Sequence, residues 1–143
     1  MPPLTDIRTS LEVGFSEGAL PKALAGCRGR DARSIAALPE FPYEDAQFNV
    51  VLMDGAVVSP KTIREAHRVL RPEGYLFFVV PEKTGKQAGF TLPDIYKTVR
   101  YGFDIVDVER PPWWLFGRRG RTLTICARKK NWKALTNTYR PYL

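Results

Sequence analysis

The chain has few of the side chains that mark metal centres, disulfide frameworks and histidine-dependent active sites. Its 143 residues include two cysteines, Cys27 and Cys126, and one histidine, His67. The cysteines are far apart and lack a partner motif, so we expect buried thiols in a reducing compartment, with no metal site. His67 follows Ile63 and Ala66 at helical spacing, and we expect its ring to pack on that helix.

Long apolar runs are also absent. No stretch approaches the length of a membrane-spanning helix, and the N-terminal residues lack the basic-then-apolar layout of a signal peptide. The 44% content of hydrophobic residues is enough for one core, and the length is that of one domain. We therefore expect a single soluble, cytoplasmic domain over residues 1–143.

Acidic residues are missing from the last quarter of the chain. Residues 110–143 carry nine lysines and arginines and no acid, a net charge of +9, whereas residues 1–109 have a net charge of −2. Aromatic residues lie among these cations, so the segment could bind nucleic acid, or an anionic membrane surface. A solvated basic surface whose aromatics cover the core or a partner chain explains it equally well. The cations proposed for contact with such an anion are Arg118, Arg119, Arg121, Lys129 and Lys130.

The stretch SLEVGFSEG at residues 10–18 predicts a strand, a glycine-containing turn and the start of a helix. The strand covers residues 11–14, and the helix covers residues 17–26. Backbone N–H groups and the helix dipole can meet an anionic or zwitterionic ligand at such a turn. Glu12 and Glu17 would add carboxylates for a ligand with an ammonium group or hydroxyls. Glycines also mark ordinary turns, so both interpretations stay open.

Two near-continuous apolar runs predict strands that are buried on both faces. They are FNVVLM at residues 48–53 and YLFFVV at residues 75–80. Between them, Ser59 and Pro60 are typical of a helix start, and a turn at residues 71–74 would end that helix. A strand, helix and strand in this order predict a right-handed crossover with parallel strands.

The remaining pattern adds a helix and a hairpin. The helix covers residues 92–101, with Gly102 at its C-terminal cap, and strands at residues 103–108 and 122–127 alternate as antiparallel strands near a sheet edge do. Residues 31–38 show no clear pattern, and Pro39 and Pro42 would interrupt a regular element there. The expected fold class is α/β, with a mostly parallel sheet and a C-terminal antiparallel hairpin.

Three segments, taken in order, resemble the S-adenosylmethionine-dependent methyltransferases with a Rossmann-like, type 11-like fold. EVGFSEG resembles their first motif, LPEFPYEDAQFNVVL resembles their "LPFPDNSFDVVL" segment, and REAHRVLRPEGYLFFVVP resembles "REIARVLKPGGRLVI". The final GFDIVDVE and TLTICARK are similar to that family's closing hairpin. The resemblance spans roughly residues 8–130 and implies methyl transfer from S-adenosylmethionine to an acceptor that the sequence does not identify.

The resemblance also implies where the cofactor would lie. In the family the first turn holds the methionine part, an acid that ends the third strand lies near the adenine, and the end of the fourth strand faces the sulfonium and the substrate. Carried over by position, the candidate cofactor-binding residues are Glu12, Gly14, Phe15, Ser16 and Gly18 on the first turn, Asp31 and Ala32 beside the adenine, and Met53, Asp54 and Gly55 after the fourth strand. No catalytic base is implied.

Two departures from the family pattern bear on the cofactor site. Ser16 replaces the middle glycine of the first motif, and only four residues separate Gly26 from Asp31. A strand, helix and strand need about 30 residues, so the second strand with its ribose-binding acid, the next helix and most of the third strand are expected to be missing. Asp31 is an alternative candidate for the ribose-binding acid.

The shortened region has two consequences. The domain could have lost its cofactor site and now act as a non-catalytic binding or assembly module, which is the alternative to an enzyme. The first strand would also lie at an exposed sheet edge, and such edges pair with other chains. We therefore expect a homodimer or a complex with a partner chain.

Overall fold

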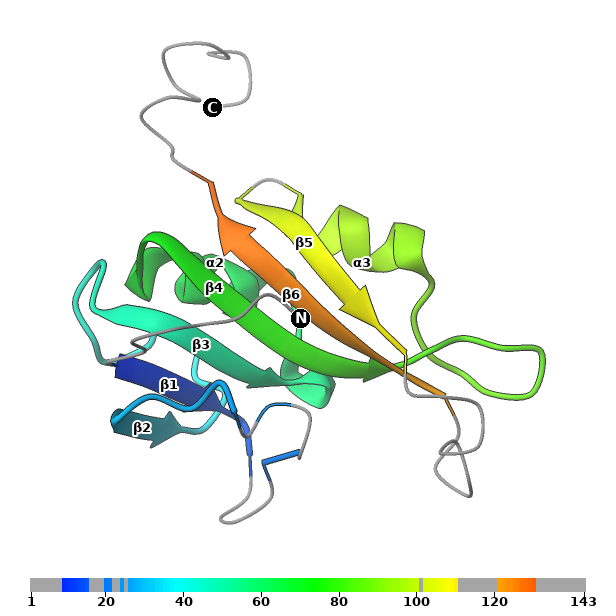
Figure 1. Ribbon diagram of the computed structural model, residues 1–143, viewed down its shortest axis with the longest axis horizontal. Coiled ribbons are helices and arrows are strands. Elements are labelled where there is room, and N and C mark those ends of the chain that lie inside the picture. Colours follow the sequence, from blue (N-terminus) through cyan, green and yellow to red (C-terminus); the bar gives the residue numbers. More distant parts are fainter. Residues whose placement is uncertain are drawn as a thin grey trace, which may run out of the picture.

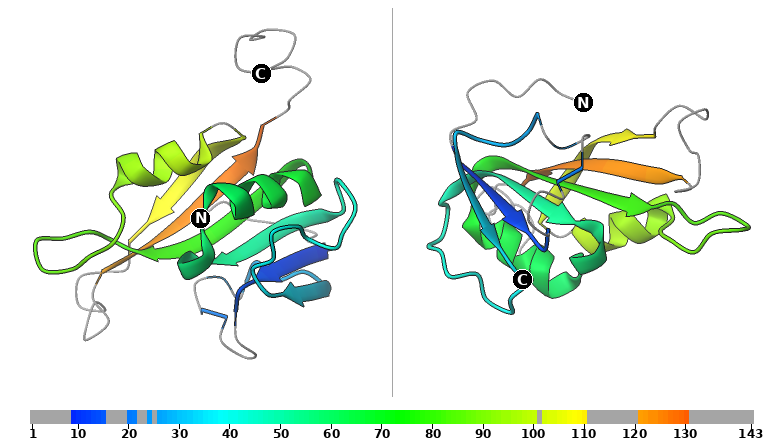
Figure 2. Two further views of the ribbon diagram at one scale, coloured as in Figure 1. Left: turned by 180° about the vertical axis from the view of Figure 1, so that it is seen from behind. Right: turned by 90° about the horizontal axis from the view of Figure 1, so that it is seen from below.

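The computed structural model describes residues 9–15, 20–21, 24, 26–100, 102–110 and 121–130. Within them, two α-helices cover one face of a six-stranded sheet (Figures 1 and 2). The strands are β1 (Thr9–Val13), β2 (Asp31–Ile35), β3 (Phe48–Asp54), β4 (Leu70–Pro81), β5 (Phe103–Glu109) and β6 (Thr122–Lys129), and the helices are α2 (Pro60–Val69), α3 (Leu92–Val99) and the short 3-10 helix η1 (Gly55–Val57).

The sheet has the order β2-β1-β3-β4-β6-β5. Strands β2, β1, β3 and β4 run parallel to one another, while β6 is antiparallel to both β4 and β5. The predicted fold class is therefore confirmed, including the crossover from β3 through α2 to β4 and the closing hairpin. None of the helices in the described ranges has the length and hydropathy required to cross a membrane.

Helix α2 begins where the sequence predicts it. The Ser59 hydroxyl accepts the backbone N–H of Thr62, the Thr62 hydroxyl accepts the backbone N–H of Ser59, and Pro60 occupies the first turn. These bonds satisfy backbone donors that the helix itself leaves without partners. Ile63 and Ala66 then face the sheet and are buried. The start of α2 thus fixes which face of the helix packs on the sheet.

Two consecutive lysines at the end of β6 cap the C-terminal ends of α2 and α3. The Lys129 ammonium donates to the Leu70 carbonyl after α2, and the Lys130 ammonium donates to the Arg100 carbonyl after α3, each at 2.7 Å. A cation at this end of a helix also interacts favourably with the helix dipole. Both lysines were proposed as contacts to an anionic partner, and in the structure their ammonium groups cap helices.

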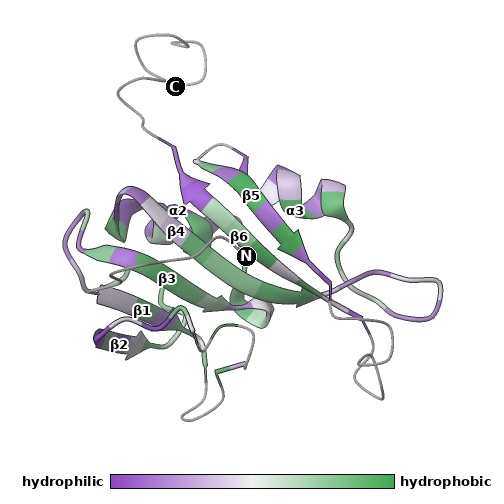
Figure 3. Ribbon diagram, in the orientation of Figure 1, coloured by the Kyte–Doolittle hydropathy of each residue, from purple (hydrophilic) through white to green (hydrophobic). Residues whose placement is uncertain are grey.

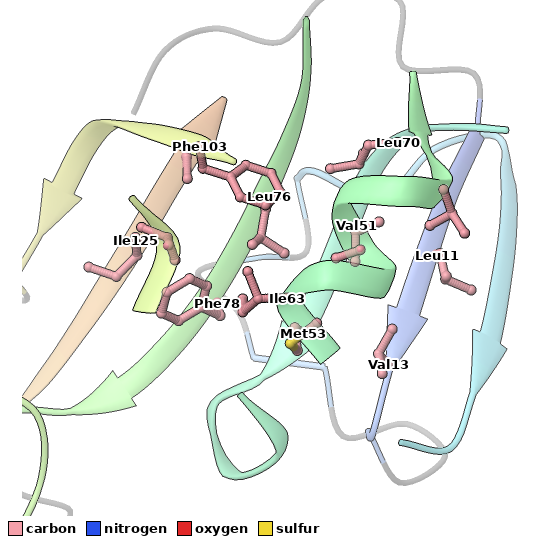
Figure 4. Packing of buried hydrophobic residues seen from close by; sticks show 14 of the residues in the cluster. Leu11, Val13, Val51, Met53, Ile63, Leu70, Leu76, Phe78, Phe103 and Ile125 are labelled. Carbon is pink, nitrogen blue, oxygen red and sulfur yellow. The ribbon is translucent and has the colours of Figure 1, made fainter. Parts of the chain in front are cut away.

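The core lies on both faces of the sheet, and the larger part is on the helix side. There, alternate residues of the strands meet the inward side chains of α2 and α3 (Figure 4). A smaller cluster on the other face contains Leu24, Cys27, Val50, Leu52, Phe77 and Cys126. β3 and β4 contribute to both, as their apolar runs predict, and they are coloured as largely hydrophobic in Figure 3. Both cysteines are buried, and no disulfide joins them.

The region between β1 and β3 differs from the prediction. Residues 31–38 have no clear pattern, yet Asp31–Ile35 forms β2, which pairs with β1 along its whole length. Its first four residues are exposed, so no apolar alternation marks it as a strand. Pairing still occurs because it satisfies the backbone groups along the free side of β1. The prediction that β1 is an edge strand is therefore wrong: β2 occupies that edge of the described sheet.

Two further boundaries differ. β4 already begins at Leu70, so the turn predicted at residues 71–74 is part of this strand, in which Glu73 has a positive φ of 64°. Helix α3 ends at Val99 rather than at residue 101. Most of the helix predicted at residues 17–26 lies outside the described residues.

Candidate functional site

The carboxyl ends of four parallel strands meet at one edge of the sheet, the carboxyl edge. In the register of the sheet, Val13 at the end of β1 lies beside Ile35 of β2 and Met53 of β3, and Asp54 lies beside Val79 of β4. The arrowheads of these strands point the same way in Figure 1. In open α/β sheets, ligands bind outside the carboxyl ends of the strands. This edge is therefore where a site is expected.

The turn after β1 requires its first glycine. Gly14 has a φ of 82°, and its N–H donates to the carbonyl oxygen of Ile35 at 2.9 Å, which joins the ends of β1 and β2. A Cβ atom there would lie 2.9 Å from both methyl carbons of Val57. Phe15 follows, half-buried against the smaller core cluster. Two further predicted residues, Ser16 and Gly18, lie outside the described residues.

The Glu12 carboxylate forms an ion pair with Arg28. Its carboxylate oxygens accept from the Arg28 guanidinium, with Nε–Oε2 at 2.8 Å and Nη2–Oε1 at 2.7 Å, and the Glu12 side chain is only 5% exposed. Beside it on β1, the Ser10 hydroxyl accepts the N–H of Gly29 at 2.9 Å. The two contacts fasten the segment before β2 onto β1. Glu12 was predicted to lie beside a ligand, and its two oxygens instead bind Arg28.

The three residues predicted after the fourth strand of the family have different roles. Met53 is fully buried in the helix-side core. The Asp54 side chain caps η1, because its Oδ1 accepts the N–H of Ala56 at 3.0 Å. Gly55 is buried, and a Cβ atom on it would collide with the carbonyl oxygen of Val79. Of the three, Asp54 is the residue that brings a charged group to the carboxyl edge.

Asp31 and Ala32 lie away from this edge. Asp31 is the first residue of β2 and pairs with Thr9, whereas Ile35 at the other end pairs with Val13. Four residues of strand correspond to about 13 Å. The Asp31 carboxylate is exposed and accepts from Nε of Arg33 at 3.3 Å. The expectation that Asp31 ends a strand is wrong, because it starts one, and the structure does not bring it to the other candidates.

The carboxyl end of β2 is apolar. Ile35 is followed by Ala36, Ala37 and Leu38, and Leu38 is 41% exposed. In Rossmann-type sites a carboxylate at the end of the second strand binds the ribose hydroxyls of a nucleoside. No described residue from Ile35 to Leu38 offers one. The residues present at the end of β2 therefore do not fit a carboxylate-bound ribose. The sequence IAAL at residues 35–38 already indicates that this strand end is apolar and carries no carboxylate.

A second ion pair lies at the same edge, and no local sequence pattern indicates it. The Arg110 guanidinium after β5 binds the carboxylate of Glu82 after β4, with Nε–Oε2 and Nη2–Oε2 both at 2.8 Å. The Gln87 amide donates to the backbone carbonyls of Glu82 and Arg121 at 2.9 Å. These contacts hold the ends of β4, β5 and β6 together. Arg110 and Arg121 therefore both lie at the carboxyl edge.

His67 packs as predicted and takes no part in the carboxyl edge. Its ring meets that of Phe103 edge-on at 5.5 Å between centroids, and Gly102 lies so close that a Cβ atom there would be 2.6 Å from Cδ2 of His67. Burial, reinforced by the charge of Lys129, lowers the pKa of His67 to about 4. The ring is neutral near pH 7.

Neither protein-family models nor curated proteins match the sequence. Solved structures do match. A 1,6-didemethyltoxoflavin-N1-methyltransferase from Burkholderia thailandensis, solved with S-adenosylhomocysteine, is 22% identical, with a TM-score of 0.64 over 86% of this chain and 71% of that one. An S-adenosylmethionine-dependent methyltransferase from Methanosarcina mazei is 16% identical, with a TM-score of 0.60 over 88% and 94%. Another, from Thermotoga maritima, is 17% identical, with a TM-score of 0.60 over 89% and 84%.

The chain therefore has the Rossmann-like fold of the S-adenosylmethionine-dependent methyltransferases. Within that fold it is a shortened form, in which one short strand, β2, completes the side of the sheet next to β1.

Proposed function

We propose that this protein binds S-adenosylmethionine at the carboxyl edge of β1 and β3 and uses it to methylate an acceptor that is not yet identified. The observation that carries the proposal is the arrangement at this edge: the left-handed Gly14 turn after β1, beside the Asp54 turn after β3, in a sheet with the methyltransferase strand order. A structural neighbour binds S-adenosylhomocysteine. When bound, the cofactor would supply a methyl group on a sulfonium cation.

The chain's own residues would position and stabilise this ligand. Gly14 permits the left-handed turn and its close packing on Val57, which sets the course of the backbone at the end of β1. The Asp54 carboxylate brings a negative charge to the same edge, which favours a nearby cation by Coulomb attraction. The chain's one histidine is packed beside Phe103, so we propose acceptors whose reacting atom needs no histidine to remove a proton.

The charge of Asp54 gives a specific test. In Asp54→Asn the amide oxygen can still cap η1, while the negative charge is lost. We expect calorimetry to show at least fivefold weaker binding of S-adenosylmethionine, with little change for S-adenosylhomocysteine, which lacks the sulfonium charge. Asp31→Asn, at the far end of the sheet, is the matched control and should change neither. Equal losses for both ligands in Asp54→Asn would contradict the proposed role of this carboxylate.

Two observations favour a second candidate function. The end of β2 offers no carboxylate to a ribose, and Glu12 is held by Arg28. Both suit a domain that keeps the fold and serves as a non-catalytic binding or assembly module. This alternative predicts that neither S-adenosylmethionine nor S-adenosylhomocysteine binds at millimolar concentration, and that a partner protein or a second copy does.

A further inference from the structure

We infer that this site does not recognise the ribose hydroxyls of its ligand, and instead places the nucleoside against an apolar shelf formed by Ile35, Ala36, Ala37 and Leu38. The inference rests on the proposed function, because it describes how that same ligand is held. It assigns a ligand preference to the carboxyl end of β2: nucleosides whose 2′ and 3′ hydroxyls are absent or blocked bind as well as those whose hydroxyls are free.

The position of the shelf follows from the sheet register. Ile35 lies beside Val13, and its carbonyl accepts the N–H of Gly14, so the shelf begins directly beside the proposed methionine site. Ile35 is half-buried and packs against the helix-side core. The following Ala36 and Ala37 are exposed and too short to reach a hydroxyl, and Leu38 presents apolar surface. A ligand that extends from the β1 turn toward β2 meets hydrocarbon.

Three carboxylates in the described ranges are bound elsewhere or lie at the far end of the sheet. Glu12 is bound by Arg28, and Asp54 caps η1. Asp31 begins β2 at the far end of the sheet. Glu40 is the next acid along the chain, but the N–H of Phe41 beside it is bound at 2.8 Å by Glu65 of α2. This contact draws the chain toward α2 directly after the shelf.

The chemical consequence concerns hydrogen bonds. A carboxylate can accept from both hydroxyls of a ribose, which is why it is the usual partner of a nucleoside diol. The apolar side chains offer no acceptor, so on the shelf the hydroxyls find no charged side chain that replaces water. Blocking them then removes no protein contact, and an apolar blocking group can rest on the shelf. A site with a carboxylate behaves in the opposite way, because blocking the diol leaves that charge without its partner.

Calorimetry with two ligands tests the inference on the full chain. The probes are S-adenosylhomocysteine and its 2′,3′-O-isopropylidene derivative, in which an acetal blocks both hydroxyls. We expect dissociation constants within threefold of each other. Binding of the blocked ligand that is tenfold weaker or worse overturns the inference and leaves the proposed function intact. Failure of both ligands to bind overturns the proposed function together with the inference.

Two substitutions, one directly after β2 and one near its start, test where the ribose lies. Ala36→Asp adds a carboxylate at the shelf, and Ala32→Asp adds the same charge at the far end of β2, where the side chain is also exposed. We expect Ala36→Asp to bind S-adenosylhomocysteine about tenfold more tightly, without a gain for the blocked ligand, and Ala32→Asp to bind like the parent. Equal effects of the two substitutions would overturn the placement of the ribose at the end of β2.

Two acids are tested in the same way because they are close in sequence to the turn or the shelf. Glu17 lies outside the described residues, and Glu40 is exposed. In Glu17→Gln and Glu40→Gln, the affinity ratio between the free and the blocked ligand should equal that of the parent protein. A shift of fivefold or more in that ratio would identify a carboxylate that binds the diol and would overturn the inference.

Discussion

The β3–α2–β4 half of the sheet and the β1–β2 half are stabilised differently. β3 and β4 are buried on both faces, and α2 between them starts at a reciprocal cap. β2 is exposed along most of its length, and the segment before it is fastened to β1 by the Glu12–Arg28 ion pair and by the bond from Gly29 to Ser10. The fold thus depends on apolar packing from β1 to β4, whereas β2 is added through backbone pairing and a few specific polar contacts.

The largest effect is expected in the packed half, at Gly55. A methyl group there would collide with the Val79 carbonyl oxygen, which is backbone and cannot move without separating β3 from β4. We expect Gly55→Ala to lower the free energy of unfolding by about 3 kcal/mol. The control is Gly85→Ala, where no atom lies within 4 Å of the added methyl group. Urea unfolding should show the control within about 0.5 kcal/mol of the parent. Equal stability of the two variants would show that the close contact between Gly55 and the Val79 carbonyl does not stabilise this half of the sheet.

The polar half should respond to the loss of one cation. Arg28→Ala leaves the buried Glu12 carboxylate without its two hydrogen bonds, and an unpartnered buried charge is costly. We expect the midpoint of thermal unfolding to fall by about 5 °C. Arg33→Ala breaks only the exposed pair with Asp31 and should shift the midpoint by about 1 °C or less. A midpoint for Arg28→Ala as high as that of Arg33→Ala would show that the ion pair does not hold this half together.

Lowering the pH should reduce the free energy of unfolding, because His67 is packed as a neutral ring. Burial lowers the pKa of His67 from 6.5 to about 4, so the unfolded chain binds a proton at a pH where the folded protein does not. Stability is then complete above pH 6.5 and declines as the pH falls toward 4. Allowing for partial exposure of the ring, we expect a loss of about 1 kcal/mol between pH 7 and pH 5. In His67→Gln, urea unfolding should lack this step. The same step in His67→Gln would assign it to another group.

The smallest effect is expected at the lysine that caps α2. Burial lowers the pKa of Lys129, and its ammonium group binds the Leu70 carbonyl. We expect Lys129→Met to lower the free energy of unfolding by about 0.5 kcal/mol, because Met keeps the apolar stem and removes the charge at the helix end. Arg128→Met, one residue earlier and exposed, is the control and should be neutral in urea unfolding. Equal losses of stability in the two variants would show that the effect comes from the net charge of the chain and not from the helix cap.

The sequence predicts the packed half well because its signals are local. Ser59 and Pro60 mark the start of α2, and the apolar runs that become β3 and β4 mark strands buried on both faces. β2 carries no such pattern, since an exposed edge strand needs only backbone pairing. Placing Asp31 at the start of a strand required the register with Thr9. The Glu82–Arg110 pair joins residues 28 apart in the chain, so only the folded sheet reveals it.

Most of the candidate site residues were predicted from the family resemblance. The structure shows that some of them lie at the carboxyl edge of the sheet and others do not. Gly14 and Asp54 reach the carboxyl edge, whereas Met53 is core and Asp31 lies at the opposite end of β2. The commitment of Glu12 to Arg28 depends on a contact across the sheet face, which the turn motif does not encode. Cofactor binding by these residues stays a prediction.

Ligand-induced stabilisation tests the central claim, that the shortened domain still binds the methyl donor. The midpoint of thermal unfolding is measured for the full chain with and without 1 mM S-adenosylhomocysteine, with adenosine as the control ligand. A dissociation constant below about 100 μM predicts more than about 1 kcal/mol of added stability, or a rise of several degrees, with S-adenosylhomocysteine. An unchanged midpoint with S-adenosylhomocysteine would contradict the account and favour the non-catalytic alternative.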